Sequence, residues 1–256
     1  MDRKELVEII TREVCRLLDE NDSRSSKAIE SLQKKTPARI GVGKAGPRLK
    51  TKTLLTLRAD HARAKDAVYD QASDTILSEL ELFKIKTKCR DIEEHLTRPD
   101  LGRQLSEEAR KQLEAQCIME PQVQIYASDG LSGTAVNANI KDILPVLTEG
   151  LKDQGIKVGT PFYLEYGRVP AMDEVSAVLG AVVTCVLLGE RPGLAAADSM
   201  SAYLAYKATP GMPESRRTVV SNIHGRGIQP VEAGAYLVEV ILKMLEKKAS
   251  GVELKL

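Results

Sequence analysis

The chain has 256 residues, of which 43% are apolar and 29% charged, so it is long and apolar enough to bury a sizeable core. Lys and Arg total 37 against 36 Asp and Glu, and this balance gives no overall field that would attract nucleic acid. No apolar run approaches the ~20 residues that a membrane span needs, so we expect a soluble chain.

The four cysteines are far apart, with no CxxC pair and no apolar signal sequence ahead of them. This pattern is typical of free thiols in a reducing cytoplasm. The cysteines are Cys15, Cys89, Cys117 and Cys185.

Residues 2–20 place leucine, isoleucine and valine at helical spacing with charges on the other side. Residues 21–37 are polar and have little to bury, so we expect a linker there. An isolated amphipathic helix of this length is marginal until something covers its apolar face. The sequence therefore predicts a targeting or docking helix on a tether, and the alternative is a frayed end that packs on its own domain.

The main domain is expected at 38–256, with a mainly helical region at 38–120 and a sheet at 121–256. Helical patterns lie at 53–69 and 106–116. Residues 27–65 are strongly basic, and the absence of interleaved aromatic residues argues against nucleic-acid binding. We expect this region to face a protein partner.

Four β-like runs follow, and helical patterns alternate with them. The runs are 123–128, 162–169, 182–189 and 218–225, and the helical stretches are 140–153, 173–179, 195–206 and 231–248. Alternating strands and helices imply a parallel sheet covered on both faces. The predicted fold is α/β, a Rossmann-like, mostly parallel sheet flanked by helices, with an N-terminal helical extension.

Small and polar residues follow each of the four runs, at 128–132, 166–169, 189–193 and 221–225. Ligands of open α/β sheets bind beyond the carboxyl ends of the strands. Read singly, Asp129 and Glu190 are typical helix caps or partners of a helix dipole. Four polar tails on one edge together predict a ligand site.

Two other motifs are weaker indications of function. Gly41–Gly46 spells GxGxxG, but a lysine-rich stretch precedes it and Pro47 follows, so the strand and helix of a dinucleotide site are missing. Asn222–Gly227 resembles, with Asn for Asp, a corrinoid element that donates histidine to cobalt, yet His224 has no second ligand nearby. Without a visible acid, base or nucleophile system, the chain fits a cofactor that brings its own chemistry.

Several long motifs closely resemble the small subunit of ethanolamine ammonia-lyase over residues 38–256. They are KAGPR (44–48), ADHARAKDAV (59–68), LTRPDLGRQL (96–105), SDGLS (128–132), GLKDQGIKVGTPFYLEYGRV (150–169), LGERPGL (188–194) and SNIHG (221–225). The resemblance implies a TIM-barrel large subunit as partner, adenosylcobalamin held between the two, and six copies of each. In the family, radical chemistry on the large subunit converts ethanolamine to acetaldehyde and ammonia.

The resemblance implies cobalamin-binding positions at Val169, Glu190 and Val219, with Arg191 beside them to donate to the cofactor or to orient Glu190. Val219 replaces a cysteine expected of relatives, which favours an apolar or backbone contact there. The alternative for Glu190 and Arg191 is mutual pairing at a helix start. The family keeps the benzimidazole of the cofactor on cobalt, which argues against His224 as axial ligand. No catalytic residue and no protein-held metal are expected on this chain.

Two other functions stay open at this point: a free-standing corrinoid carrier or mutase domain that uses His224, and an NAD-dependent oxidoreductase that uses residues 41–46. For the lyase, the resemblance also implies a location inside a bacterial microcompartment in the cytoplasm, reached through the N-terminal helix.

Overall fold

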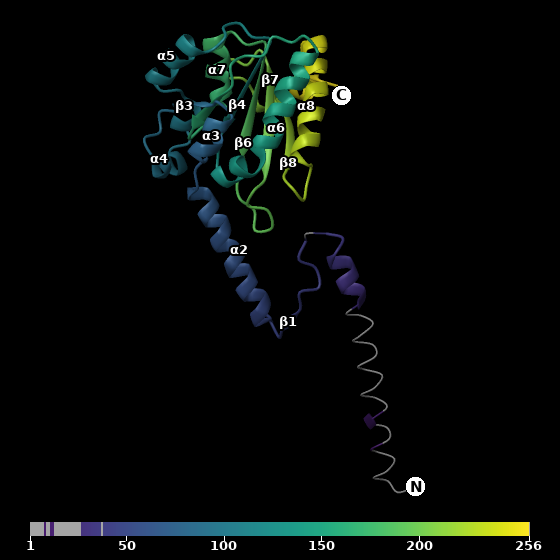
Figure 1. Cartoon of the computed structure of the whole chain (residues 1–256). Coiled ribbons are helices and arrows are strands. Elements are labelled where there is room, and N and C mark those ends of the chain that lie inside the picture. The colour runs from purple at the N-terminus through teal and green to yellow at the C-terminus, as the bar shows by residue number, and fades with distance from the viewer. Residues whose placement is uncertain (1–7, 9–10, 13–26, 37, 256) are drawn as a thin grey trace. The chain divides into compact units, whose positions relative to one another are not determined.

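The structure is a computed structural model that describes residues 8, 11–12, 27–36 and 38–255 (Figure 1). The predicted helix at 2–20 and much of the predicted linker at 21–37 lie outside these residues. The chain divides into two compact units, Met1–Asp60 and His61–Leu256.

In the first unit, residues 27–33 are helical and a short hairpin follows, made of β1 (Lys44–Ala45) and β2 (Arg48–Leu49). The two strands pair antiparallel, with Lys44 opposite Leu49. Gly41, Gly43 and Gly46 all have positive φ, a conformation that glycine adopts without steric cost. The GxGxxG stretch is therefore a hairpin and its approach, and it opens no βα unit of the dinucleotide-binding kind.

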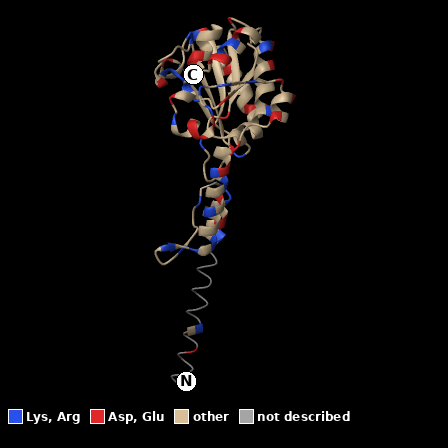
Figure 2. Cartoon of the chain, turned by 90° about the vertical axis from the view of Figure 1, so that its left-hand side faces the viewer, with Lys and Arg blue, Asp and Glu red and all other residues tan. Residues whose placement is uncertain are grey.

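The first unit also carries the start of α2 (Thr51–Tyr69). The Arg39 guanidinium contacts the Asp60 carboxylate at 2.5 Å, and the Thr53 hydroxyl donates to the Val42 carbonyl at 3.2 Å. Leu54 and Leu55 are 41% and 58% exposed. Basic side chains recur along this part of the chain (Figure 2).

The second unit contains the sheet and the helices that cover it. In chain order its elements are α3 (Asp74–Glu79), β3 (Phe83–Lys86), α4 (Ile92–Thr97), η1 (Leu101–Arg103), α5 (Glu107–Gln116), β4 (Val123–Ser128), α6 (Gly133–Asp153), β5 (Phe162–Glu165), α7 (Ala171–Leu179), β6 (Val183–Gly189), β7 (Met200–Tyr206), η2 (Glu214–Arg216), β8 (Thr218–Ile223), α8 (Pro230–Lys247) and η3 (Gly251–Glu253).

The sheet has six strands in the order β3-β5-β4-β6-β7-β8. The strands β3, β5, β4 and β6 pair parallel, and β7 pairs antiparallel with both β6 and β8. The prediction of an α/β fold with a mostly parallel sheet flanked by helices is confirmed. All four predicted strand runs form strands at or within the predicted bounds.

One predicted helix is wrong. Residues 195–206 are predicted to be helical, but they form a loop followed by β7. Met200, Ala202 and Leu204 pack into one core, and the alternate residues Tyr203 and Ala205 pack on the other face. This period of two is what a strand with two covered faces requires, and tertiary packing overrides the helical propensity of alanine.

The sequence analysis also missed β3 and the first two turns of α6. The four residues of β3, FKIK, carry two lysines and look like the charged segments around them. Helix α6 begins seven residues before the prediction, at Gly133, because the Ser132 hydroxyl accepts the Ala135 N–H at 3.1 Å and caps the first turn.

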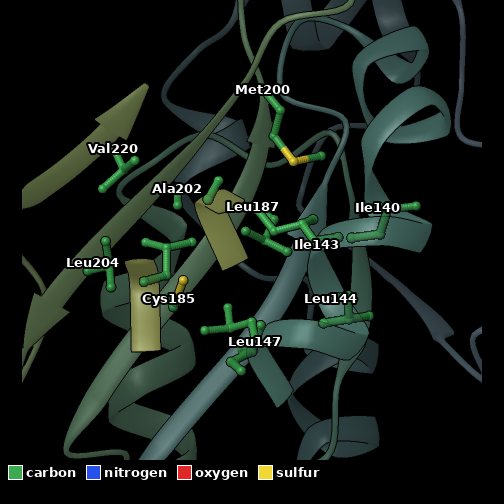
Figure 3. Close-up of a cluster of buried hydrophobic side chains, with 14 of the residues drawn as sticks. Ile140, Ile143, Leu144, Leu147, Cys185, Leu187, Met200, Ala202, Leu204 and Val220 are labelled. Carbon is green, nitrogen blue, oxygen red and sulfur yellow. The ribbon is translucent and has the colours of Figure 1, made fainter. Parts of the chain in front are cut away.

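Two apolar clusters lie on the two faces of the sheet. One joins α6 and α8 to β4, β6 and β7, and the other joins α5 and α7 to β4, β5 and β6. Figure 3 shows the first cluster, where Ile143 and Leu147 of α6 pack against Cys185 and Leu187 of β6. None of the helices in the described part of the chain is long and apolar enough to cross a membrane.

Candidate functional site

The four polar tails lie at the same edge of the sheet. β4, β5 and β6 run parallel, and β8 runs the same way because the antiparallel β7 separates it from β6. Direct contacts join the tails: the Leu131 N–H donates to the Gly189 carbonyl at 3.0 Å. We call residues 128–132, 166–169, 189–193 and 221–225 the rim.

Asp129 joins the tails of β4 and β5. Its carboxylate accepts the Tyr166 backbone N–H at 2.8 Å and lies 3.3 Å from the Ser128 hydroxyl, while that hydroxyl also accepts the Gly167 N–H. Tyr166 has a φ of 58°, so the turn that follows β5 is an unusual one that these bonds hold in place. Burial raises the pKa of the Asp129 carboxyl from 3.8 to about 7.

His95 of α4 supports the tail of β4. Its Nε2–H donates to the Gly130 carbonyl at 2.5 Å, and the ring is fully buried. The Arg168 guanidinium donates to the His95 carbonyl at 2.7 Å. Burial, with the nearby Arg168 charge, lowers the pKa of His95 from 6.5 to about 4, so the ring stays neutral at pH 7.

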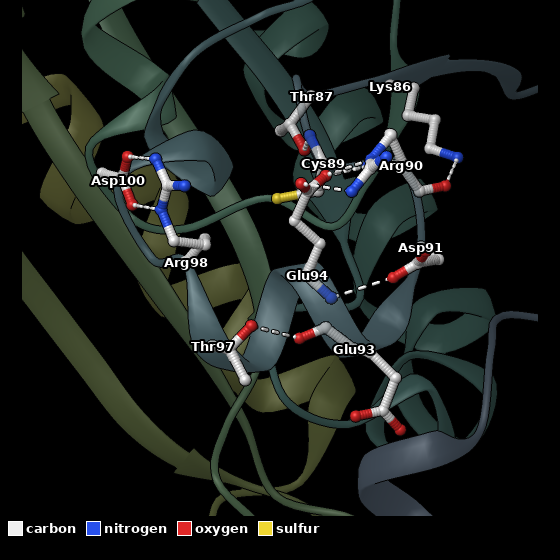
Figure 4. A network of polar contacts seen from close by, with 10 residues as sticks. All are labelled: Lys86, Thr87, Cys89, Arg90, Asp91, Glu93, Glu94, Thr97, Arg98 and Asp100. Carbon is white, nitrogen blue, oxygen red and sulfur yellow. Dashed lines mark hydrogen bonds and ion pairs between the residues drawn. The ribbon is translucent and has the colours of Figure 1, made fainter.

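Polar contacts around the tail of β3 fix the position of α4 (Figure 4). The Asp91 carboxylate accepts the Glu94 N–H at 2.9 Å and caps the helix. Arg90 donates to the Glu94 carboxylate through its backbone N–H at 2.8 Å and through its guanidinium at 3.1 Å. These contacts stabilise the first turn of the short helix that carries His95, and the contact of His95 with Gly130 joins that helix to the rim.

Glu190 is half-buried and follows β6 directly. Its Oε1 accepts the Tyr203 hydroxyl proton at 2.7 Å, and its backbone N–H donates to the Ser199 carbonyl. Arg191 is exposed, and in the described part of the chain neither a hydrogen bond nor an ion pair joins it to Glu190. A loop follows Glu190, so the reading of both residues as a pair at a helix start is wrong.

Val169 belongs to the rim, whereas Val219 lies outside it, near the start of β8. Val169 is half-buried and its carbonyl accepts the Met172 N–H in the first turn of α7. Val219 is 46% exposed on β8, directly opposite Tyr203 of β7. The structure thus brings Val219 close to the Tyr203–Glu190 pair, while Val169 belongs to the β5 tail.

His224 uses both ring nitrogens within its own loop. Its Nδ1 accepts the Arg226 N–H at 3.3 Å, so Nε2 carries the proton that it shares with Asn222 Oδ1 at 2.9 Å. Among the described residues, no group of three or more His, Cys, Asp or Glu side chains could hold a metal ion. Cys185 is buried mid-strand, and burial raises the pKa of its thiol, which suits core packing rather than reactivity.

Two residues of the site escaped the sequence analysis. Tyr203 lies in the segment that was expected to be helical. His95 contacts a residue 35 positions away, and no local pattern indicates that partner. Once β7 is recognised as a strand, the alternation of residues 200–206 places Tyr203 on the face opposite Met200, but no local signal indicates its partner.

A mostly parallel sheet with a polar rim at its carboxyl edge defines an α/β protein of the class that binds ligands beyond the ends of its strands. Comparison with known proteins is consistent with this class. The family model described as "Ethanolamine ammonia-lyase light chain (EutC)" matches residues 26–255. The chain belongs to the ethanolamine ammonia-lyase light-chain family, and is therefore a lyase subunit.

Individual relatives agree with the family match. The chain is 57% identical over 240 residues to the ethanolamine ammonia-lyase small subunit of Clostridium tetani, covering 94% of this chain and 81% of the relative. It is 50% identical over 252 residues to that of Fusobacterium nucleatum, covering 98% and 85%. It is also 50% identical over 224 residues to that of Listeria monocytogenes, covering 88% and 76%. The resemblance noted from the sequence is confirmed.

We expect Asp129→Asn to change how the stability of the chain depends on pH. Between its ordinary pKa of 3.8 and its folded pKa of about 7, Asp129 keeps a proton in the folded state that it loses on unfolding. Its stabilising contribution is therefore complete below pH 4 and lost as the pH rises to about 7. The unfolding free energy of the variant relative to the native chain should rise by about 2 to 4 kcal/mol between pH 4 and 8.

Urea unfolding of both proteins across that pH range measures the difference. His95 acts with the opposite sign, since its lowered pKa costs stability as the pH falls from 6.5 to 4, but it is present in both proteins and cancels. The exposed Asp142 of α6 supplies a control variant, Asp142→Asn. Parallel curves for the native chain and Asp129→Asn would show that Asp129 does not titrate in this way.

Proposed function

We propose that this chain holds adenosylcobalamin at the rim, at the interface with a TIM-barrel large subunit that converts ethanolamine to acetaldehyde and ammonia. The observation that carries the proposal is the Glu190 carboxylate at the carboxyl edge of the sheet. One of its oxygens is bound by Tyr203, and the exposed Val219 lies beside that pair. Glu190 and Val219 are also positions at which the family resemblance implies cobalamin contacts.

The residues at the rim fit the chemistry of a corrinoid. Cobalamin presents neutral amide arms around a large, mostly apolar ring. The Glu190 carboxylate can accept an amide N–H through its second oxygen. Val219, Leu194 and Ile228 are 46%, 38% and 37% exposed and offer apolar contact. The cofactor, when bound, supplies the cobalt–carbon bond whose cleavage begins the radical chemistry.

The role of this chain is then to bind and orient the cofactor. Glu190 accepts from an amide arm, and the exposed Arg191 guanidinium can donate to an amide oxygen. Val169 contributes a half-buried apolar contact near the start of α7. Because His224 spends both ring nitrogens on Asn222 and Arg226, it is poorly placed to serve as an axial ligand. This arrangement favours the lyase subunit over a corrinoid carrier that depends on His224.

The first unit is a candidate surface for the large subunit. Its described residues are rich in Lys and Arg, and its leucines Leu32, Leu54 and Leu55 are exposed. Exposed apolar side chains among basic residues suit a partner that offers an apolar patch with acidic neighbours. The hairpin at residues 44–49 in this unit also argues against the NAD-dependent alternative.

The proposal predicts that the chain co-purifies with the large subunit when both are expressed together. The purified pair should release ammonia from ethanolamine only when adenosylcobalamin is added, and either subunit alone should not. The mass of the complex in analytical ultracentrifugation should correspond to six copies of each chain. Cobalamin binding by this chain alone at full affinity would favour a free-standing carrier, and a nicotinamide requirement would favour the oxidoreductase.

Glu190→Gln should weaken cobalamin binding by the reconstituted complex by about 1 to 3 kcal/mol, or roughly 5- to 150-fold in Kd. The reason is that a neutral amide accepts a hydrogen bond less strongly than a carboxylate. Equilibrium titration with cyanocobalamin measures the effect without turnover. Glu114→Gln, on the exposed side of α5, is the matched control. An unchanged Kd for Glu190→Gln would remove Glu190 from the cofactor site.

We also propose that residues 1–20 direct the enzyme into a bacterial microcompartment. The support is their amphipathic pattern and the polar stretch that follows. A fluorescent protein fused behind residues 1–20 should concentrate in purified shells, whereas a fusion with glutamates at Ile9, Ile10, Leu17 and Leu18 should stay outside. Equal recovery of the two fusions in the shells would contradict this role.

A further inference from the structure

Tyr203 lies where it can control the geometry of Glu190. Its hydroxyl donates to Glu190 Oε1 at 2.7 Å, across a loop that separates the two residues by 13 positions. The ring is half-buried and packs against the apolar cluster on the α5–α7 face. A tyrosine has only two side-chain torsions, so a ring held by packing presents its hydroxyl at a nearly fixed point.

Glu190 needs such a support because its own surroundings constrain it little. It is the first residue after β6, and the chain that follows is a loop up to β7. Arg191 does not pair with it. A carboxylate side chain with three torsions and no other side-chain partner in the described chain would otherwise sample several rotamers, and fixing it on binding would cost free energy.

The strand register places Tyr203 beside a second implied cofactor position. Tyr203 of β7 pairs with Val219 of β8, and directly paired residues of antiparallel strands point to the same face. Val219 is exposed, so the ring edge of Tyr203 and the Val219 side chain border the same open surface. The hydroxyl uses one oxygen of Glu190 and leaves Oε2 available to a ligand donor.

We propose that Tyr203 is a positioning residue for the cofactor: it holds Glu190 through Oε1 so that Oε2 accepts an amide N–H of the bound corrinoid. This inference rests on the proposed cobalamin site. Burial and the hydrogen bond to Glu190 both raise the pKa of the Tyr203 hydroxyl, so it remains a donor at neutral pH. If Tyr203 only anchored the loop at residues 190–199, its replacement would lower the stability of the protein without a specific effect on cofactor binding.

A double-mutant cycle in the reconstituted complex tests the proposal. The proteins are the native complex, Tyr203→Phe, Glu190→Gln and the combined variant, and the probe is cyanocobalamin binding at equilibrium. Tyr203→Phe should weaken binding about 10- to 150-fold, the range for losing one hydrogen bond to a charged group. The combined variant should bind no more than about twofold more weakly than Glu190→Gln alone, because both changes remove the same interaction between Glu190 and the cofactor.

Tyr206→Phe is the matched control, since Tyr206 is a half-buried tyrosine of the same strand that packs with the other core. Its Kd should not change. In turnover, the loss caused by Tyr203→Phe should fall mainly on the KM for adenosylcobalamin rather than on kcat. Thermal unfolding of each complex shows whether a variant has simply lost stability.

The outcomes distinguish the positioning role of Tyr203 from the cofactor role of Glu190. Weaker binding by Glu190→Gln with native binding by Tyr203→Phe overturns the positioning role and leaves the cofactor site standing. Multiplicative losses in the combined variant show that Tyr203 acts independently of Glu190, and they overturn it as well. Native binding by both single variants overturns the proposed cobalamin role of Glu190 together with this inference.

Discussion

The site depends on the common direction of four strands. The site contains polar residues that are far apart in the sequence: Asp129, Arg168, Glu190 and Asn222. They meet at one edge of the sheet because strands that run in the same direction end at the same edge. Here β7 turns back between β6 and β8, and this reversal restores the direction of β8. Without the antiparallel β7, the 221–225 tail would not share an edge with the other three.

Hydrogen bonds of two buried side chains then give that edge a defined shape. Asp129 ties the β5 tail to the β4 tail, and His95 reaches from α4 to the carbonyl of Gly130. Burial disfavours the charged form of both groups: His95 is neutral at pH 7, and Asp129, with a pKa of about 7, is partly protonated there. The rim is therefore preorganised by hydrogen bonds between buried groups. Glu190 belongs to this rim, and its partner Tyr203 pairs with the exposed Val219 of β8.

The sequence predicts much of the sheet but little of this network. The runs at β4, β5, β6 and β8 are apolar, β-branched and closed by glycine or polar residues, which identifies them locally. β7 resists prediction because alanine-rich segments favour helix until packing on both faces selects a strand. The contacts of Asp129 and His95 join residues about 35 positions apart, and Tyr203 reaches Glu190 through a loop. Such contacts depend on the complete fold, which no local pattern encodes.

The connection between β6 and β7, which contains no helix, has a consequence for the accessible surface of the sheet. A parallel connection would have needed a crossover helix, and that helix would have lain across one face of the neighbouring strands. Because the chain returns directly from β6 to β7, no crossover helix lies there. On the α5–α7 side, Tyr203 is half-buried and Val219 is 46% exposed. The connection between β6 and β7 therefore leaves Val219 of β8 open to solvent next to Tyr203 and its partner Glu190.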